Sequence, residues 1–417
     1  MAPTDTAAPV QAIFLEQARA LVRGGELLPG GVETLARRLQ HSAETQTPLK
    51  VKLGLDPTRP DLHLGHAVVL KKFRAFQDLG HDGILIIGDA TAMIGDPSGR
   101  SATRPPLSEE EVEANAQTYL DQAGKIIDVR KAKVVRNSAW LSPMCLGDFL
   151  KLAAKATVAQ ILVREDFAKR YAENKPISLH ELFYPLMQGF DSVEVEADIE
   201  LGGSDQRFNN LMGRELQEAY ARKHPQLVLL MPLLEGTDGK VKMSKSYPDH
   251  CINLLDTPAD MYGKLMSIPD EMIARYELLL GLLTEAQLEE QQKNMRENNM
   301  NPRDVKMHLA RYIVGTYHTQ QLATEAETAF VNQFQKKQIP DDIPEAQLQA
   351  NTPLPLMDLI VAHQLAVSKN EAKRLLEGGG VKIDGEKIAS TDYQIQGAPG
   401  ATFVLQVGKR KFLKLNF

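Results

Sequence analysis

Cysteine is scarce in this chain. Its 417 residues include two, Cys145 and Cys251, which lie far apart and form no paired-cysteine motif. Disulfide frameworks and zinc ribbons need several cysteines at short, regular spacings. The sequence therefore argues against both and favours two reduced thiols, in a core or on the surface.

Long hydrophobic runs are missing as well. The longest apolar stretches, such as 84–88 and 227–234, are well short of the roughly 18 to 20 residues that span a bilayer. The amino terminus, Met1–Asp5, has neither a basic region followed by an apolar run nor the arginine content of a transit peptide. We therefore expect no membrane span and a cytoplasmic protein.

The chain has no overall excess of positive charge, since its formal net charge is −6 at pH 7. That value averages over domains and does not exclude a nucleic-acid partner. Residues 353–417 contain nine Lys and Arg and six Asp and Glu, a surplus of +3 that leaves −9 for the remainder. The basic carboxyl-terminal part is therefore predicted to be separate from an acidic main body.

The overall composition is that of a globular protein. Hydrophobic residues make up 43% of the chain and charged residues 24%, which argues against disorder and against a fibrous repeat. A chain of 417 residues is too long for one ordinary core. Its length predicts about two to four domains.

From residue 50 to about residue 255, short β-prone runs alternate with helical stretches. This alternation predicts an α/β fold, with a parallel sheet that helices cover on both faces. The predicted strands are the runs 51–55, 84–87, 134–135, 197–201 and 228–231.

The remaining segments show other patterns. Helical periodicity dominates before residue 40 and again after residue 258, and a proline-containing stretch then resists helix. A helix over Lys369–Glu377, ended by glycines, precedes a hairpin with an Asp-Gly turn over 381–388. The predicted division is an amino-terminal helical segment (1–48), an α/β domain (49–255) with a helical insertion (about 146–190), an α-helical domain (256–338), a linker (339–352) and a small α+β domain (353–417).

The first candidate motif lies where the first predicted strand ends and a helix begins. It reads Gly54-Leu-Asp-Pro-Thr58 and then Leu62-His-Leu-Gly-His66. Backbone N–H groups at such a strand end, with the positive end of the following helix, attract phosphate, and Gly65 lets a purine or ribose approach the backbone. The imidazoles of His63 and His66 can donate to phosphoryl oxygens. Two surface or capping histidines would have the same spacing, so this motif alone leaves the function open.

The second candidate motif is Lys242-Met-Ser-Lys-Ser246, preceded by the polar, glycine-containing segment 235–240. Two ammonium groups three residues apart on such a loop can close over a polyphosphate and neutralise charge as pyrophosphate leaves. A lysine pair alone is usually a solvated face. This five-residue string, about 180 residues after His63, is far more specific.

Together, the two motifs resemble the signature motifs of class I aminoacyl-tRNA synthetases. Segments 88–100, 182–191 and 201–206 are similar to segments of tyrosyl-tRNA synthetases, in the expected order. The carboxyl-terminal helix and hairpin resemble a small RNA-binding domain shared with a ribosomal small-subunit protein, which bacterial tyrosyl enzymes carry and tryptophanyl enzymes lack. The chain is therefore identified as a member of the bacterial tyrosyl family, in a divergent second subgroup.

The resemblance implies a Rossmann-like catalytic domain with a helical insertion, followed by an α-helical and a small α+β tRNA-binding domain. It implies that tyrosine and ATP, accompanied by Mg²⁺, give tyrosyl-adenylate and pyrophosphate, and that tyrosine then passes to the 3′ end of tRNA(Tyr). It implies no permanently bound cofactor and no metal held by the protein. It also implies a homodimer that forms through the insertion, and no membrane partner.

Residue roles follow from the same resemblance. The catalytic residues would be His63, His66, Lys242 and Lys245. The ATP site would comprise Asp56, Thr58, Gly65, Gly203, Asp205, Met243, Ser244 and Ser246. The tyrosine site would comprise Asp96, Tyr184, Gln188, Asp191 and Gln206. The tRNA would contact Lys369, Lys373, Arg374, Lys409, Arg410 and Lys411, and Arg100 and Arg104 are candidates for pyrophosphate or tRNA contact.

Residues Tyr184, Gln188 and Asp191 can be grouped from their spacing alone. At positions i, i+4 and i+7 they lie along one face of a helix, so one pocket can hold all three. A polar face turned to solvent has the same spacing. The resemblance assigns the substrate ammonium to Tyr184, Gln188 and Asp96, and the phenolic hydroxyl to Asp191. A buried carboxylate that accepts from that hydroxyl is left unpaired by phenylalanine, which gives selectivity.

Lys52 departs from the family pattern. Many tyrosyl enzymes have a tyrosine two residues before the glycine at Gly54, and that tyrosine contributes a second contact to the substrate hydroxyl. A long cation cannot serve in the same way. Either Asp191 works with a different partner or the strand is shifted, and the sequence leaves both alternatives open.

Two other functions fit parts of the sequence. A tryptophanyl or other class I synthetase is disfavoured by Asp191 and by the carboxyl-terminal unit. A non-catalytic RNA-binding paralogue is disfavoured because the residues of both signature motifs are present.

Overall fold

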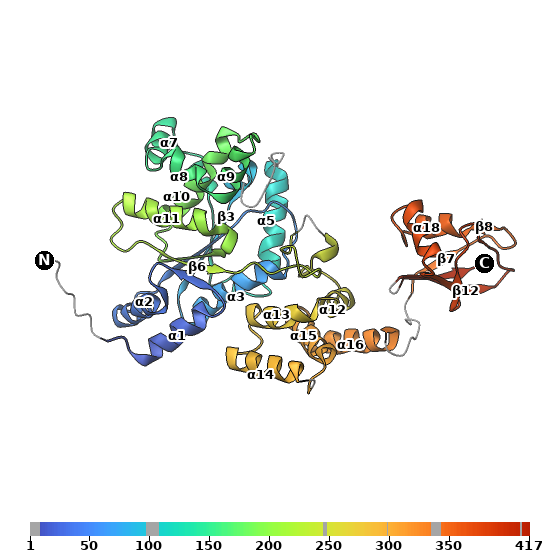
Figure 1. Ribbon diagram of the computed structural model, residues 1–417. Coiled ribbons are helices and arrows are strands. Elements are labelled where there is room, and N and C mark those ends of the chain that lie inside the picture. The colour runs from blue at the N-terminus through green and yellow to red at the C-terminus, as the bar shows by residue number, and fades with distance from the viewer. Residues whose placement is uncertain (1–8, 97–107, 245–247, 298, 335–342, 409–410) are drawn as a thin grey trace. The chain divides into compact units, whose positions relative to one another are not determined.

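The computed structural model describes residues 9–96, 108–244, 248–297, 299–334, 343–408 and 411–417 (Figure 1). The chain divides into two compact units, Met1–Glu327 and Thr328–Phe417. The division falls inside helix α16 (Gln320–Phe334), earlier than residue 338, where the predicted helical domain ends.

The first unit is built around a mixed sheet. The strands that the structure describes lie in the order β1-β6-β5-β2-β3-β4, and β1 is antiparallel to β6 whereas the other pairs are parallel. Their bounds are β1 (Glu26–Leu28), β2 (Lys50–Leu55), β3 (Asp82–Ile87), β4 (Lys133–Arg136), β5 (Ile199–Gly203) and β6 (Leu227–Met231).

Burial explains why the sequence predicted most of this sheet. Strands β3, β5 and β6 are almost wholly buried, and such strands carry continuous apolar runs. Each of the five predicted runs overlaps a strand. The sequence analysis missed β1, because three residues are too few for a strand pattern. The segment 1–48 is therefore not wholly helical, since β1 lies between α1 (Ala12–Val22) and α2 (Gly31–Thr45).

The strand order creates a crevice at one edge of the sheet. From β2 the chain continues to β3 and β4 on one side, whereas β5 and β6 lie on the other side of β2. Neighbouring strands whose connections diverge in this way leave a gap beyond their carboxyl ends, which is the usual ligand site of open α/β sheets. Here the gap lies beyond Leu55 of β2 and Gly203 of β5.

Helices cover both faces of the sheet (Figure 1). Helix α3 (Leu64–Asp78) packs against β2, β3 and β5, and α11 (Arg207–Ala219) packs against β5 and β6 with α10 (Tyr184–Glu194) beside it. Further helices are α4 (Asp89–Ile94), α5 (Glu109–Ala123), α6 (Ser138–Leu141), α7 (Leu146–Ala153), α8 (Val158–Leu162) and α9 (Glu165–Ala172).

Residues 258–334 are mainly helical, in line with the periodicity of the sequence. Asn301 caps α15 by accepting from the backbone N–H of Arg303, and Pro302 occupies the first helical position. The helices are α12 (Pro258–Met266), α13 (Ile273–Leu279), α14 (Glu285–Arg296), α15 (Pro302–Tyr317) and α16. Among the described residues, no helix combines the length and the apolar character needed to cross a membrane.

The second unit is a small α+β fold with its own core. Its described strands form a sheet in the order β10-β9-β12-β13-β7 and a pair, β11 and β8. The elements are β7 (Glu345–Gln347), β8 (Leu354–Pro355), α17 (Leu356–Ala362), α18 (Lys369–Glu377), β9 (Val381–Ile383), β10 (Glu386–Ile388), β11 (Gln394–Ile395), β12 (Thr402–Val407) and β13 (Lys411–Asn416).

Two sequence predictions can be compared with this unit. The predicted helix and hairpin are present as α18 and the β9–β10 pair, with Asp384 and Gly385 at positive φ in the turn. The linker predicted over 339–352 is wrong in part, because β7 lies within it and pairs with β13. Three residues directly after Pro344 have no strand signature of their own, and their pairing partner is about 70 residues away in the sequence.

Candidate active site

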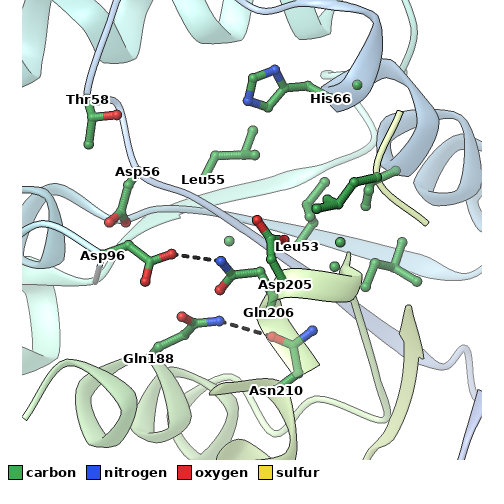
Figure 2. A pocket seen from close by; sticks show the side chains of 18 of the residues that line it. Leu53, Leu55, Asp56, Thr58, His66, Asp96, Gln188, Asp205, Gln206 and Asn210 are labelled. Atoms are coloured by element: carbon green, nitrogen blue, oxygen red, sulfur yellow. Dashed lines mark hydrogen bonds between the residues drawn. The ribbon is translucent and has the colours of Figure 1, made fainter. Parts of the chain in front are cut away.

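A cavity of about 320 Å³ occupies the crevice beyond β2 and β5 (Figure 2). Its lining comes from segments far apart in the sequence: the end of β2, the start of α3, α4, α10, β5 and the loop that contains Lys242. The sheet topology therefore brings together the segments that the sequence analysis singled out one by one.

Fifteen of the predicted site residues line this one cavity. They are Asp56, Thr58, His63, Gly65, His66, Asp96, Tyr184, Gln188, Asp191, Gly203, Asp205, Gln206, Lys242, Met243 and Ser244.

The other predicted site residues fall into two groups. Lys369, Lys373, Arg374 and Lys411 are exposed on the second unit. Lys245, Ser246, Lys409 and Arg410, with the weaker candidates Arg100 and Arg104, lie outside the described residues.

The two histidines stand at the amino terminus of α3. His63 is the N-cap residue, and its backbone N–H donates to Nδ1 of His66 over 3.2 Å. The ring centroids are 3.9 Å apart. A ring nitrogen that accepts carries no proton, so neutral His66 has its proton on Nε2. Both histidines therefore take part in capping α3 and also line the cavity, whereas their donation to phosphoryl oxygens stays a prediction.

Two glycines keep the cavity open beside the backbone. A Cβ at Gly54 would meet no protein atom within 4 Å, so the space above this part of β2 belongs to the cavity. A Cβ at Gly65 would lie 3.0 Å from the ring of His63. A side chain at either position would narrow the approach to the strand end and to the α3 terminus.

Lys242 reaches across the cavity to Asp205. Its Nζ lies 2.9 Å from Oδ2 of that residue. The chain before it is a hairpin-like turn anchored on α13, because Arg275 and Tyr276 hydrogen-bond to Glu235. One end of the loop is therefore fixed, whereas Lys242 and Asp205 are both partly exposed and can part when a ligand competes for them.

Hydrogen-bonded amide and carboxylate side chains lie beside the cavity, and Figure 2 shows the bonds from Gln206 to Asp96 and from Gln188 to Asn210. Gln206 donates to Asp96 over 2.7 Å, and Asn209 donates to both Gln206 and Gln188, over 3.2 and 2.8 Å. Gln188 in turn donates to Asn210 over 3.0 Å. These contacts orient oxygen acceptors around one region of the cavity, which suits a substrate ammonium group.

Asp191 is 3% exposed and hydrogen-bonded at both oxygens. The indole Nε1 of Trp140 donates to Oδ1 over 2.9 Å, and Nδ2 of Asn137 lies 3.4 Å from Oδ2. Burial raises the pKa of Asp191 to about 7, against the lowering effects of Lys52, Trp140 and Asn137. A carboxylate held in this way retains lone pairs for a further donor from the cavity.

Asp56 forms a second, partly buried acidic centre at the end of β2. It accepts from the hydroxyls of Tyr184 and Thr91, each over 2.8 Å. Burial is also the main cause that raises the pKa of Asp56 to about 7, with Asp96 and Asp191 adding to the rise. Tyr184 thus holds Asp56 in this structure while its ring lines the cavity.

Lys52 does not line the cavity. Its side chain is wholly buried, and β2 is in regular parallel register with β3 and β5. The sequence left open whether the strand is shifted or Asp191 works with a different partner. The geometry favours a different partner, because β2 is regular and Asp191 is hydrogen-bonded to Trp140 and Asn137.

The sequence analysis missed several residues around the cavity. Thr91, Asn137, Trp140, Asn209 and Asn210 come from three separate helices or their caps, and no local spacing links one helix to the next. Trp140 offered one signal, because it is the single tryptophan of the chain. Its indole N–H needs an acceptor when it is partly buried.

The raised pKa of Asp191 gives a prediction on stability. A carboxyl whose folded pKa lies above its unfolded value destabilises the fold once it is ionised, so this effect is present above pH 7 and disappears as the pH falls to about 4. Asp191→Asn should therefore raise the free energy of unfolding by on the order of 1–3 kcal/mol at pH 8. Denaturant unfolding at pH 8 and pH 4 checks this, and an equal gain at both pH values would contradict it.

Comparison with known proteins assigns the chain to a family. Residues 44–335 match the tRNA synthetases of class I (W and Y), and the chain belongs to this family. Residues 335–415 match the tyrosine–tRNA ligase SYY-like C-terminal domain.

Individual relatives agree with that assignment. The chain is 52% identical to the tyrosine–tRNA ligase of Thermotoga maritima over 88% of this chain and 90% of that protein. It is 49% identical to the tyrosine–tRNA ligase of Moorella thermoacetica over 96% of this chain and 95% of that protein.

Solved structures show the same fold. A tyrosyl-tRNA synthetase from Archaeoglobus fulgidus, complexed with L-tyrosine, superposes with a TM-score of 0.59 at 23% identity, over 75% of this chain and 99% of that one. A C-terminally truncated mitochondrial tyrosyl-tRNA synthetase from Aspergillus nidulans gives a TM-score of 0.60 at 21% identity, over 77% and 94%.

Proposed function

We propose that this chain is a tyrosine–tRNA ligase. It activates L-tyrosine with ATP to tyrosyl-adenylate and pyrophosphate, and then transfers tyrosine to the 3′ end of tRNA(Tyr). The observation that carries the proposal is a buried carboxylate, Asp191, in a cavity that the residues of both signature motifs also line. Relatives about 50% identical over most of the chain, named tyrosine–tRNA ligases, support tyrosine over tryptophan.

In the tyrosine subsite, Asp191 accepts from the phenolic hydroxyl. The substrate ammonium binds among Asp96, Gln188 and Tyr184 at the other end, with Gln206 near the reacting carboxylate. This orientation of the bound tyrosine is supported by the hydrogen-bonded side chains from Asp96 to Gln188, which present oxygen acceptors to the cavity.

In the ATP subsite, the adenosine lies against the glycines at the ends of β2 and β5, and the phosphates lie at the amino terminus of α3. The tyrosine carboxylate attacks the α-phosphorus in line, and pyrophosphate leaves. The carboxylate is already ionised, so the reaction needs no general base and no enzyme nucleophile. Catalysis comes from positioning and from charge stabilisation by His63, His66, Lys242 and Lys245.

Lys242 must exchange partners during this reaction. In the structure it is paired with Asp205, the residue proposed to accept from the ribose hydroxyls. ATP binding supplies each of the two with a new partner: the ribose donates to Asp205 and the phosphates accept from Lys242. The pair thus fixes the positions of both residues before the nucleotide arrives.

Mg²⁺ enters with ATP as part of the co-substrate. Among the described residues, no group of three or more His, Cys, Asp or Glu side chains is arranged to hold a metal ion. The phosphates of ATP are then its main ligands. The cytoplasmic location expected from the sequence stays a prediction.

The experiment that tests the proposed function follows both half-reactions. The purified chain is incubated with ATP and tyrosine, the protein-bound adenylate is isolated, and tRNA(Tyr) or tRNA(Trp) transcripts are added. Tyrosyl-adenylate and transfer to tRNA(Tyr) alone are expected. An adenylate that forms with tryptophan instead of tyrosine, or no adenylate, would overturn the proposal.

Dimerisation through the insertion is proposed from an exposed apolar surface. Six large apolar side chains on and beside α7, α8 and α9 are between 59% and 74% exposed, which is more than scattered surface residues explain. They are Leu146, Leu150, Val158, Val163, Tyr171 and Leu179.

Val163→Glu should therefore convert a dimer into a monomer. Light scattering after gel filtration should give twice the chain mass of 46.2 kDa for the wild type and the chain mass for the variant. Val367→Glu is the matched control, because this valine is 88% exposed on the second unit and should leave the dimer intact. A wild type that runs as a monomer would refute the proposal.

The second unit is proposed to bind tRNA through its basic residues. Lys369, Lys373 and Arg374 are exposed on α18, and the two lysines pair with acidic neighbours that phosphates can replace. Truncation after residue 334 should raise KM for tRNA about 10-fold or more and leave tyrosine-dependent pyrophosphate exchange within about 2-fold. The cut must precede β7, because that strand pairs with β13. Equal loss of both activities would argue against this division of labour.

A further inference from the structure

A buried ion pair lies directly behind the proposed tyrosine subsite. Nζ of Lys52 on β2 is 2.8 Å from Oε1 of Glu200 on β5, and the two side chains are 0% and 2% exposed. The two residues are register partners in the parallel sheet. Side chains two residues apart on a strand point to the same face, so Lys52 lies on the face of Gly54, which lines the cavity.

Both partners are fully engaged. The Lys52 ammonium also donates to the hydroxyl of Ser192 over 2.7 Å and to the backbone carbonyl of Gln188 over 3.0 Å, so each of its three N–H groups has an acceptor. Glu200 also accepts from Ser192, over 3.0 Å, and from Gln226. Burial of two ions is tolerable only with such complete hydrogen bonding.

The contacts of Lys52 are concentrated on one helix. Gln188 and Ser192 belong to α10, and Asp191 lies between them. Lys52 therefore ties the middle of α10 to the central strand, at the turn that carries two proposed tyrosine-binding side chains. Glu200 itself lines the cavity, whereas Lys52 does not.

We propose that Lys52 and Glu200 are a positioning pair for tyrosine recognition: without contacting the substrate, Lys52 holds α10 in place and supplies the positive charge beside the Asp191 carboxylate. This inference rests on the proposed function. It assigns a role to the position at which the chain departs from the tyrosine of many relatives. In place of a tyrosine that contacts the substrate hydroxyl inside the cavity, Lys52 provides a positive charge that acts on Asp191 from outside the cavity lining.

The charges around Asp191 support this role. Lys52 is the leading group that lowers the pKa of Asp191, followed by Trp140 and Asn137, whereas Glu200 raises it. Asp56 and Tyr184 also interact with Asp191: burial is the main cause that raises their pKa values, and the charge of Asp191 adds to the rise. Among the described residues, Lys52 is thus the cation that leads the groups lowering the pKa of Asp191.

The test is the pH dependence of substrate selection in the full-length chain. The ratio of kcat/KM for tyrosine to that for phenylalanine isolates the hydroxyl contact, because both substrates share the effect of Asp56. In the wild type this ratio should rise with pH as Asp191 ionises. Lys52→Met should move that rise upward by about one pH unit and so lower the ratio at pH 7.5 about 3-fold.

Removing the negative charge of Glu200 should shift the pH dependence of the tyrosine-to-phenylalanine ratio in the opposite direction. Glu200→Gln should move the rise to lower pH, and the double variant Lys52→Met/Glu200→Gln should return it to within a few tenths of a unit of wild type. The double variant leaves no unpaired buried charge, so it folds even where Lys52→Met alone does not. Arg170→Met and Glu181→Gln, each made singly, and the double variant of both are the matched controls, because that pair is similarly buried but does not line the cavity.

Each result decides the inference. The inference is supported if the pH at which the ratio rises moves in opposite directions in the two single variants. If Lys52→Met does not fold, a rise at lower pH in Glu200→Gln supports it. Folded variants that keep the wild-type ratio at every pH, or the same shift in the Arg170 control, would overturn it. A wild type without tyrosine-dependent exchange would instead reject the proposed function.

Discussion

Replacing Asp191 with asparagine is expected to lower kcat/KM for tyrosine by about 10²- to 10³-fold in ATP–pyrophosphate exchange. Trp140 and Asn137 hold the carboxylate so that it can accept from the phenolic hydroxyl. An amide at this position is a weaker acceptor and can turn a donor toward the hydroxyl. Phenylalanine has no hydroxyl to lose, so its kcat/KM should change by less than about 3-fold.

Glu194→Gln is the matched control for this variant. Glu194 is a carboxylate on the same helix, α10, but it is exposed and does not line the cavity. Glu194→Gln should leave kcat/KM unchanged for both tyrosine and phenylalanine. A similar loss for tyrosine and phenylalanine in Asp191→Asn would mean that the residue supports the pocket and does not recognise the hydroxyl.

Replacing Lys242 with methionine is expected to slow adenylate formation about 10²-fold while the Kd for tyrosine stays within about 2-fold. The ammonium is proposed to bind the polyphosphate as charge moves onto the leaving pyrophosphate, and its partner in the structure is Asp205 of the proposed ATP subsite. Stopped-flow or rapid-quench measurement of adenylate formation, together with equilibrium dialysis of tyrosine, separates the two quantities.

Lys240→Met provides the matched control. Lys240 lies two residues earlier on the same loop, is exposed and does not line the cavity. Its loss should change neither quantity. If both lysine variants slowed the reaction alike, the general positive charge of the loop would be responsible, and the specific role of Lys242 would be wrong.

Much of the fold was accessible from the sequence because its signals are local. Buried parallel strands carry continuous apolar runs, and the glycine-terminated helix and the Asp-Gly hairpin of the second unit are short-range patterns. β1 and β7 were missed for the converse reason. Each has three residues and exists through pairing with a strand far away in the sequence, β6 or β13.

Many residues of the candidate site could be predicted from the sequence, but the hydrogen bonds that orient them could not. The candidate residues from the two signature motifs that the structure describes line one cavity, together with Tyr184, Gln188 and Asp191. The residues that orient them, such as Trp140 and Asn137, are brought to Asp191 by tertiary packing alone. Lys52 could be recognised as unusual from the sequence, but its partner Glu200 is revealed only by the register of β2 and β5.

The central claim is that this cavity activates tyrosine, and amino-acid-dependent ATP–pyrophosphate exchange tests it most directly. Each of the twenty amino acids is supplied in turn to the full-length chain, at equal concentration and with Mg²⁺ and ATP. Exchange that depends on tyrosine, with every other amino acid at background, is the expected result. Exchange with a different amino acid, or none with tyrosine, would contradict the account.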